Sequence, residues 1–326
     1  MPKDFAQIVW DAAVEDDARQ LIRLAVREDL ERQLDWTTIA LVDPEALGVA
    51  DVVARAGGIV AGLPAARLAL DEMDPRLDWQ ATVDDGATVE PGQRLATISG
   101  PARSLLTAER PLLNMLGHLS GVATLARRYV DAVSGTRARV YDTRKTTPGW
   151  RRLEKYAARL GGAHNHRTGL FDAVLIKDNH LALGGWGGRG ADVFEGAKVA
   201  DSNSADRHSP GGAVRRARAF LAQRPEGRKT AEMIVEIEVD TREQFRDALA
   251  ARPDIILLDN MSLDELRGAV AERDALAAGV ELEASGGVRL DTIAEIARTG
   301  VDRISVGALT HSAAWLDVGL DWRSRD

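Results

Sequence analysis

The chain has 326 residues, of which 45% are hydrophobic, and this is enough for two globular domains of about 150 residues each. Its 42 basic and 50 acidic residues give a formal net charge of -8, which repels polyanions and excludes a general nucleic-acid surface but allows a local basic pocket. The absence of cysteine excludes disulfides, thiolate metal sites and cysteine nucleophiles. No apolar run approaches about 18 residues and the amino terminus is acidic, so we expect a cytoplasmic protein with no membrane partner.

The first part of the chain has the pattern of a small α/β sandwich. Apolar residues recur at helical spacing over residues 12–34, which indicates one or two amphipathic helices. Short β-prone pieces follow over residues 49–98, with turn signals between them and a helix expected over 64–73. The phrase VDDGATVEPGQRLATI resembles the hammerhead of lipoyl and biotinyl carrier domains, but the absence of lysine between Lys3 and Lys145 argues against a covalent carrier. We assign residues 1–115 to this sandwich and expect 312–326 to join it.

The second part alternates strands with helices. A long helix is expected over 107–133, and six β-rich runs then end in charged or small polar residues: RARVYDTRK, DAVLIKDNH, MIVEIEVD, DIILLDN, VELEASGG and DRISVGAL. Helical stretches are expected over 150–160, 213–222, 242–250, 263–273 and 290–298. This rhythm predicts a parallel α/β sheet in a closed or nearly closed barrel over 116–311, with a doubly wound open sheet as the alternative. The chemistry of such a barrel lies at the carboxyl ends of its strands.

One segment departs from this rhythm. Residues 184–212 are rich in Gly, Ser, Asp and Asn and follow the second predicted barrel strand. A connection of this length is either a mobile lid or a disordered insertion. Because it follows LIKDNH, we hypothesise a flexible flap at the mouth of the active site.

Several cations follow the first two barrel strands. Arg144 and Lys145 end the first, and His166, Arg167 and Lys177 belong to the next unit. Such a cluster suits a ligand that carries several carboxylate or phosphate oxygens, because Arg grips bidentately and Lys adds a compact charge. A solvated turn, a metal site at His164 and His166, and a Schiff-base lysine at Lys177 are the alternatives.

Acidic residues end the next strands. Glu236 and Glu238 alternate on one strand and share a face, Asp259 ends IILLDN, and Glu283 lies in VELEAS. Acids at the mouth of a barrel either bind a divalent cation or balance neighbouring cations.

The last two strand ends resemble a phosphate site. Ser285, Gly286 and Gly287 follow one strand, Gly307 follows the next, and His311 lies four residues further on. Glycines allow backbone N–H groups to approach a phosphate closely, and a helix start adds a favourable dipole.

These motifs together resemble a known family. The strings YDTRKTTPGWRRLEKYA, GGAHNHRTGLFDAVLIKDNH, EIEVD, ILLDNM, LEASGG and ISVGALTHS closely resemble quinolinate phosphoribosyltransferases, the carboxylating nicotinate-nucleotide pyrophosphorylases. The resemblance implies an N-terminal α/β sandwich, an incomplete TIM-like α/β barrel and a homodimer with a shared active site, and it leaves assembly beyond a dimer open. It also implies the conversion of quinolinate and phosphoribosyl pyrophosphate to nicotinate mononucleotide, carbon dioxide and pyrophosphate in NAD biosynthesis, with Mg²⁺.

The same resemblance implies roles for individual residues. Quinolinate would be bound by a set of cations, with Arg110 supplied by the partner subunit: Arg110, Arg144, Lys145, His166, Arg167 and Lys177. Glu238 and Asp259 would face the magnesium and pyrophosphate, and with Lys177 they are the expected catalytic residues. Ser285, Gly286, Gly307 and His311 would hold the ribose 5-phosphate. The alternatives are a related phosphoribosyltransferase-like protein of molybdenum metabolism and a Schiff-base aldolase that uses Lys177.

Overall fold

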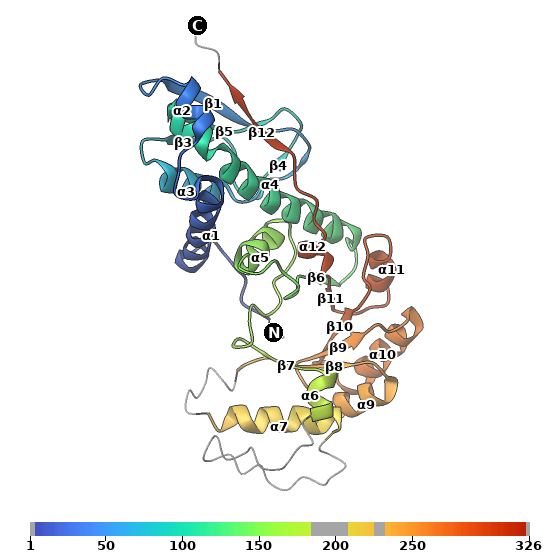
Figure 1. Ribbon diagram of the computed structural model, residues 1–326. Coiled ribbons are helices and arrows are strands. Elements are labelled where there is room, and N and C mark those ends of the chain that lie inside the picture. Colours follow the sequence, from blue (N-terminus) through green and yellow to red (C-terminus); the bar gives the residue numbers. More distant parts are fainter. Residues whose placement is uncertain (1–3, 184–207, 225–231, 324–326) are drawn as a thin grey trace. The chain divides into compact units, whose positions relative to one another are not determined.

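The computed structural model describes residues 4–183, 208–224 and 232–323, which group into two compact units (Figure 1). The parallel-sheet unit contains Met1–Ala6, Ala132–Arg144 and His166–Val306. The antiparallel-sheet unit contains Gln7–Asp131, Lys145–Asn165 and Gly307–Asp326. The grouping differs from the expected division at 115/116, because residues 4–6 group with the parallel-sheet unit and residues 116–131, 145–165 and 307–311 group with the antiparallel-sheet unit.

The parallel sheet has all six strands that the sequence predicts. They lie in the order β6-β11-β10-β9-β8-β7, and every pair between neighbours is parallel. The strands are β6 (Arg139–Tyr141), β7 (Val174–Ile176), β8 (Val235–Val239), β9 (Ile255–Asp259), β10 (Glu281–Ser285) and β11 (Arg303–Ser305). The predicted parallel α/β architecture is therefore confirmed. The sheet ends at β6 and β7, which agrees with an incomplete barrel.

Helices follow most of these strands, and local sequence signals define where they begin. The helices of this unit are α6 (Asp178–Leu183), α7 (Pro210–Ala222), α9 (Arg242–Ala250), α10 (Leu263–Leu276) and α11 (Ile293–Ala297). Thr241 caps α9 by accepting a hydrogen bond from the N–H of Gln244, and Ser262 and Glu265 form a capping box at α10. Helices α7 and α9 both pack against β8.

The segment 184–212 is shorter than the sequence suggests. Ser209 caps α7, which begins at Pro210, so residues 210–212 are helical and do not belong to an insertion. Proline suits the first helical turn because its missing N–H would have no partner inside the helix there. The flap hypothesis concerns mainly residues 184–207, which lie outside the described residues.

The antiparallel-sheet unit combines a four-stranded sheet with long helices. The sheet has the order β12-β1-β5-β3, and β2 pairs separately with β4. The strands are β1 (Leu47–Ala54), β2 (Gly58–Ile59), β3 (Asp78–Ala81), β4 (Thr88–Val89), β5 (Arg94–Pro101) and β12 (Val318–Trp322). The helices are α1 (Ala12–Leu30), α2 (Trp36–Leu41), α3 (Leu63–Met73), α4 (Ala102–Ala132), α5 (Arg151–Leu160) and α12 (Ala308–His311). Pairing of β12 with β1 confirms that the end of the chain returns to this sheet.

Among the described residues, no helix has both the length and the apolar character needed to cross a membrane.

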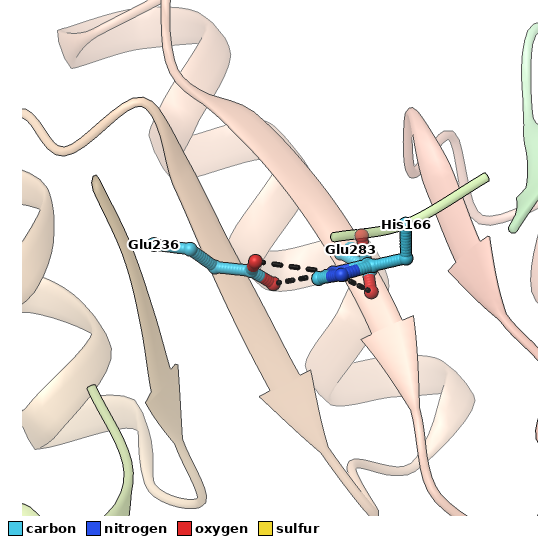
Figure 2. Close-up of side chains that lie close together, drawn as sticks. All are labelled: His166, Glu236 and Glu283. Atoms are coloured by element: carbon cyan, nitrogen blue, oxygen red, sulfur yellow. Dashed lines mark hydrogen bonds and ion pairs between the residues drawn. The ribbon is translucent and has the colours of Figure 1, made fainter. Parts of the chain in front are cut away.

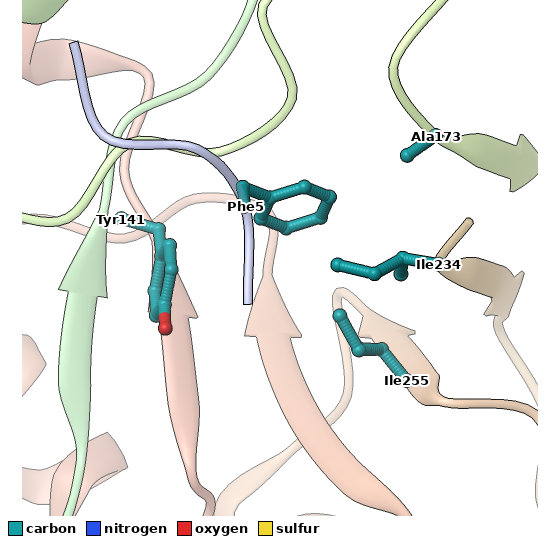
Figure 3. Packing of buried hydrophobic residues seen from close by; sticks show 5 residues of the cluster. All are labelled: Phe5, Tyr141, Ala173, Ile234 and Ile255. Carbon is teal, nitrogen blue, oxygen red and sulfur yellow. The ribbon is translucent and has the colours of Figure 1, made fainter. Parts of the chain in front are cut away.

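The amino-terminal segment lies at the amino ends of the parallel strands. Phe5 is buried against Tyr141, Ala173, Ile234 and Ile255, and Figure 3 shows its ring between Tyr141 and the two isoleucines. Ala173 and Ile234 each precede a strand directly, and Ile255 begins β9. Phe5 therefore packs at the amino edge of the sheet. The functional residues were expected at the opposite edge, where the carboxyl ends of the strands lie.

Candidate active site

Functional side chains gather at the carboxyl edge of the parallel sheet. Lys177 follows β7 directly, Glu238 lies near the end of β8, and Asp259 and Ser285 end β9 and β10. The last two residues are partners in the parallel register. Because neighbouring parallel strands end at the same edge, the fold brings together residues that are up to 108 positions apart in the chain.

A pocket at this edge is rich in carboxylate oxygens. Its lining residues are Asp178, Leu181, Glu238, Val239, Asp240, Gln244 and Asp259. The sequence predicted Glu238 and Asp259 as site residues but not Asp178 and Asp240. Asp178 directly follows Lys177, and Asp240 directly follows the end of β8. Carboxylates are the ligands that Mg²⁺ prefers, so the donor set fits the expected cation.

Lys177 forms an ion pair with Glu238, which lines this pocket. The two side chains come from the neighbouring strands β7 and β8. The ion pair engages the charged ammonium form, whereas a Schiff base requires a neutral amine as the nucleophile. The pairing thus favours an electrostatic role for Lys177 over the aldolase alternative.

Arg144 and Arg167 place two positive charges close together. Burial, and then the positive charge of Arg144, lower the pKa of Arg167. Arg167 is buried, and its Nη1 lies 3.4 Å from the carbonyl oxygen of Ala173. Arg144 has a buried Nε with no hydrogen-bond partner among the described residues. Two neighbouring guanidinium groups of this kind form a site that an anion with several oxygens would stabilise.

His166 is held from both ring nitrogens by protein groups. Its Nε2 lies 3.1 Å from Oε2 of Glu236 and 3.5 Å from Oε1 of Glu283, as Figure 2 shows. The backbone N–H of Arg167 donates to Nδ1 at 2.8 Å. The carboxylates therefore hold a proton on Nε2, and Nδ1 fixes the start of Arg167.

Arg303 completes this buried cluster. Its guanidinium lies 3.1 Å from Glu283 and 2.7 Å from Glu281, and its side chain is fully buried. Burial raises the pKa of Glu283, but the hydrogen bond from His166 and the charge of Arg303 lower it overall. His166, Glu236 and Glu283 have the ligand types of a metal site, yet Arg303 already occupies one side of Glu283. Glu236 and Glu283 therefore balance cations, which is the second role that the sequence left open.

The turn after β10 has a backbone that only glycine accommodates. Gly286 has a φ of 91°, and a Cβ there would lie 2.2 Å from Oδ1 of Asn260. Asn260 in turn donates its N–H to the carbonyl oxygen of Ser285 at 2.9 Å. The predicted Ser285–Gly286 turn is thus packed tightly against the end of β9.

Two expected phosphate ligands, Gly307 and His311, lie beside Lys145 in the antiparallel-sheet unit. A Cβ at Gly307 would lie 3.0 Å from Cδ of Lys145 and 3.2 Å from Nε2 of His311. Thr310 Oγ1 donates to the carbonyl oxygen of Lys145 at 2.7 Å, which fixes the backbone of that lysine. The structure therefore places Lys145 beside Gly307 and His311, which the family resemblance assigns to the ribose 5-phosphate. Arg110 lies in the same unit, exposed on α4.

The buried Glu154, which the sequence did not predict as a site residue, supports the loop after Lys145. Glu154 on α5 is fully buried, and its Oε1 lies 2.9 Å from Nε2 of His118 on α4. Its other oxygen accepts the N–H of Thr147 at 3.1 Å. A charged residue in the helical phrase RRLEKYA gives no sequence signal for this contact, because most such residues face solvent.

Two family models match this chain. The description "Quinolinate phosphoribosyl transferase, N-terminal domain" covers residues 35–120, and "Quinolinate phosphoribosyl transferase, C-terminal domain" covers 122–194 and 211–321. Neither match includes the first 34 residues.

Curated relatives and solved structures agree with these matches. A nicotinate-nucleotide pyrophosphorylase [carboxylating] of Mycobacterium leprae is 44% identical over 94% of this chain and 97% of its own length. A probable enzyme of the same description from Bacillus subtilis is 36% identical over 83% of this chain and 82% of its own length. The structure of the nicotinate-nucleotide pyrophosphorylase from Francisella tularensis has a TM-score of 0.82 and 32% identity, covering 98% of this chain and 100% of that one. The corresponding structure from Ehrlichia chaffeensis has a TM-score of 0.77 and 32% identity, covering 93% and 98%.

Proposed function

From the premise that this chain belongs to the quinolinate phosphoribosyltransferase family, we propose how its residues divide the reaction between them. The enzyme is a pentosyltransferase of NAD biosynthesis, a carboxylating nicotinate-nucleotide pyrophosphorylase. Its substrates are quinolinate and phosphoribosyl pyrophosphate. The products are nicotinate mononucleotide, carbon dioxide and pyrophosphate.

The buried guanidinium of Arg167, together with the buried Nε of Arg144 that has no partner among the described residues, is the observation that carries the assignment of the quinolinate pocket. Quinolinate has two ring carboxylates, and burying them without partners would be costly. We assign Arg144, Arg167 and Lys177 to these carboxylates. Because both ring nitrogens of His166 face protein groups, we assign His166 to the pocket as the residue that orients Arg167.

We assign the phosphates of phosphoribosyl pyrophosphate to two groups of residues. Lys145 and His311 converge on Gly307, where the absence of a Cβ lets both side chains approach the backbone closely, so we assign the ribose 5-phosphate to these three residues. The Ser285–Gly286 turn supplies further backbone N–H groups for phosphate at the edge of the parallel sheet.

Glu238 and Asp259 are the residues that would hold Mg²⁺, with Asp178 and Asp240 in the same pocket. When bound, Mg²⁺ neutralises charge on the pyrophosphate leaving group. The contact between Lys177 and Glu238 keeps a positive charge at this position as well. Removal of the metal by a chelator should abolish turnover, and added Mg²⁺ should restore it.

The chain contributes positioning and electrostatics to the chemistry. As the bond between C1 of the ribose and pyrophosphate breaks, C1 becomes positive and the pyridine nitrogen attacks it. The ring nitrogen is then cationic, so loss of the adjacent carboxylate as carbon dioxide leaves an electron pair on C2 that this charge stabilises. A proton from solvent then adds to C2 and gives nicotinate mononucleotide. Arg144 and Arg167 hold the ring carboxylates in place while the nitrogen attacks, and no covalent enzyme intermediate is required.

We also propose that the active enzyme is a cytoplasmic homodimer in which Arg110 of each subunit reaches the site of the other. The exposed apolar side chains of Leu170 and Phe171, three and four residues after Arg167, support a contact surface near the quinolinate pocket. On dilution, activity should fall in proportion to the fraction of protein that dissociates to monomers. Sedimentation measures that fraction, and the assay measures activity in the same samples.

The decisive experiment follows the products. Purified enzyme with quinolinate, phosphoribosyl pyrophosphate and Mg²⁺ should release carbon dioxide and pyrophosphate in equal amounts. Reactions without one substrate are the controls. Pyrophosphate release without carbon dioxide, or borohydride trapping of a carbonyl compound on Lys177, would contradict the proposal.

A further inference from the structure

Two residues near the amino terminus, Asp4 and Phe5, reach the buried cluster around His166. They precede the residues that the family models match, and they lie about 160 positions before His166 in the chain. Both belong to the parallel-sheet unit, as does His166. Contacts of Asp4 and Phe5 with this cluster connect them to His166 and Arg167, which we assign to the quinolinate pocket.

Phe5 packs against one face of the His166 imidazole. The two ring centroids are 4.3 Å apart and the planes make an angle of 30°, which is a stacked arrangement. Phe5 itself is buried among Tyr141, Ile234 and Ile255, so its own ring has little freedom (Figure 3). The stacking therefore fixes the plane of the imidazole, and with it the position of Nδ1.

Asp4 is connected to the same imidazole through the charged side chains of Arg303 and Glu283. Its carboxylate lies 3.2 Å from Nη2 of Arg303 and 2.9 Å from Nη1 of Arg139. The Nε of Arg303 lies 3.1 Å from Glu283, which in turn lies 3.5 Å from Nε2 of His166. Asp4 thus shares the charge of Arg303 with Glu283, the carboxylate that faces the histidine.

The chain beyond Phe5 continues along the segment that carries His166. Gln7 and Asn165 exchange two hydrogen bonds of 3.3 and 2.9 Å, and the N–H of Ile8 donates to Oδ1 of Asn165 at 2.7 Å. Asn165 is the residue before His166. Successive residues of the amino-terminal segment therefore contact successive residues of this segment.

We propose that Asp4 and Phe5 are positioning residues that hold His166, and through its Nδ1 the backbone of Arg167, in the orientation that binds quinolinate. The proposal rests on the proposed function, because it assigns Arg167 to a quinolinate carboxylate. A segment at the amino edge of the sheet that served stability alone would leave substrate affinity unchanged when altered. The two roles therefore predict different results.

The first test observes His166 directly, without substrate. Phe5→Leu keeps most of the apolar volume but removes the flat ring, and Asp4→Asn removes the charge with little change in shape. Phe245→Leu makes the same change as the first variant at a fully buried phenylalanine of α9 and is the matched control. In protein labelled at histidine, the NMR signal of His166 is assigned by its loss in H166Q. We expect this signal to move in Phe5→Leu and Asp4→Asn and to stay in Phe245→Leu.

The second test separates substrate affinity from stability. Phe5→Leu and Asp4→Asn should raise the KM for quinolinate about tenfold, the effect of one misplaced hydrogen bond to a charged group, and leave the KM for phosphoribosyl pyrophosphate within about twofold. Phe245→Leu should lower the Tm and change neither KM. The proposal is overturned if the His166 signal or the KM for quinolinate in the two variants matches that of Phe245→Leu.

If Phe5→Leu or Asp4→Asn does not fold, the other variant tests the positioning role by the same two measurements. A wild-type enzyme that releases neither carbon dioxide nor pyrophosphate refutes the proposed function instead. In that case an unmoved His166 signal in the variants still refutes the positioning role.

Discussion

Gly307 offers a substitution whose effect follows directly from the local geometry. In Gly307→Ala the new Cβ would lie 3.0 Å from Cδ of Lys145 and 3.2 Å from Nε2 of His311, both closer than the 3.4 Å at which ordinary contact begins. The φ of Gly307 is -66°, so alanine causes no backbone strain. The neighbours are flexible side chains, so the protein should fold normally while Lys145 and His311 move away from the position that we assign to the ribose 5-phosphate.

The size of the effect follows from the contact that is lost. A hydrogen bond to a charged group contributes about 1.5 to 3 kcal/mol, and about 1.4 kcal/mol corresponds to a factor of ten. Displacement of one such contact should therefore lower kcat/KM for phosphoribosyl pyrophosphate by about 10-fold to about 150-fold. The assay varies phosphoribosyl pyrophosphate at saturating quinolinate and measures carbon dioxide release. The KM for quinolinate should change little.

Gly279→Ala is the matched control, because a Cβ at Gly279 meets nothing within 4 Å. Its kcat/KM should equal that of the wild type. The assignment of the phosphate site to Lys145, Gly307 and His311 is refuted if Gly307→Ala retains kcat/KM for phosphoribosyl pyrophosphate within about twofold of the control, since that difference is smaller than the loss of any charged hydrogen bond.

Three further substitutions test other parts of the site. Lys177→Ala should reduce kcat/KM by about 10-fold to about 150-fold without unfolding the protein, because it removes a charged contact that we assign to a quinolinate carboxylate and such a contact contributes about 1.5 to 3 kcal/mol. Arg303→Met should lower the free energy of unfolding by about 3 to 5 kcal/mol, measured by urea denaturation, because it leaves buried carboxylates unpaired. Glu154→Gln should cost about 1 to 3 kcal/mol in the same measurement and raise the KM for phosphoribosyl pyrophosphate, because the amide keeps only one of the two oxygens with which the buried Glu154 contacts His118 and Thr147.

Each of these predictions has a control elsewhere in the chain. Arg267→Ala removes an exposed cation of α10 and should leave activity unchanged, so near-normal turnover in Lys177→Ala would contradict the role of Lys177. Arg323→Met breaks an exposed ion pair with Asp51. If Arg303→Met lowers the free energy of unfolding only as much as Arg323→Met does, burial of the Arg303 contacts does not increase their contribution to stability. Unchanged stability in Glu154→Gln would mean that the loop after Lys145 does not depend on this contact.

The local pattern of the chain predicted most secondary structure, because the signals involved act over a few residues. The helix expected over 242–250 matches α9 in full, and the six barrel strands lie inside the predicted runs. Helix α4 begins at Ala102, five residues before the expected start, and α7 begins at Pro210 inside the expected insertion. Helix boundaries depend on capping and packing as well as periodicity, so they were predicted less accurately.

The acidic residues show where the interpretation from sequence stopped. It identified Glu236, Glu238, Asp259 and Glu283 as acids at the barrel mouth and left two roles open for them. The structure separates them, since Glu236 and Glu283 face His166 whereas Glu238 and Asp259 line the pocket. The sequence shows that side chains two apart in a strand share a face, but it does not show which side chain of another strand meets them.

The sequence by itself determined the class of fold, the family and most of the charged residues at the strand ends, because periodicity and motifs are patterns of residues that lie close together in the chain. Only the tertiary structure decided the contacts between distant parts of the chain. Lys145 meets Gly307 and His311, Glu154 meets His118, and Phe5 stacks on His166. Such pairs depend on strand order and side-chain packing, which many sequences satisfy in different ways, so no local pattern encodes them.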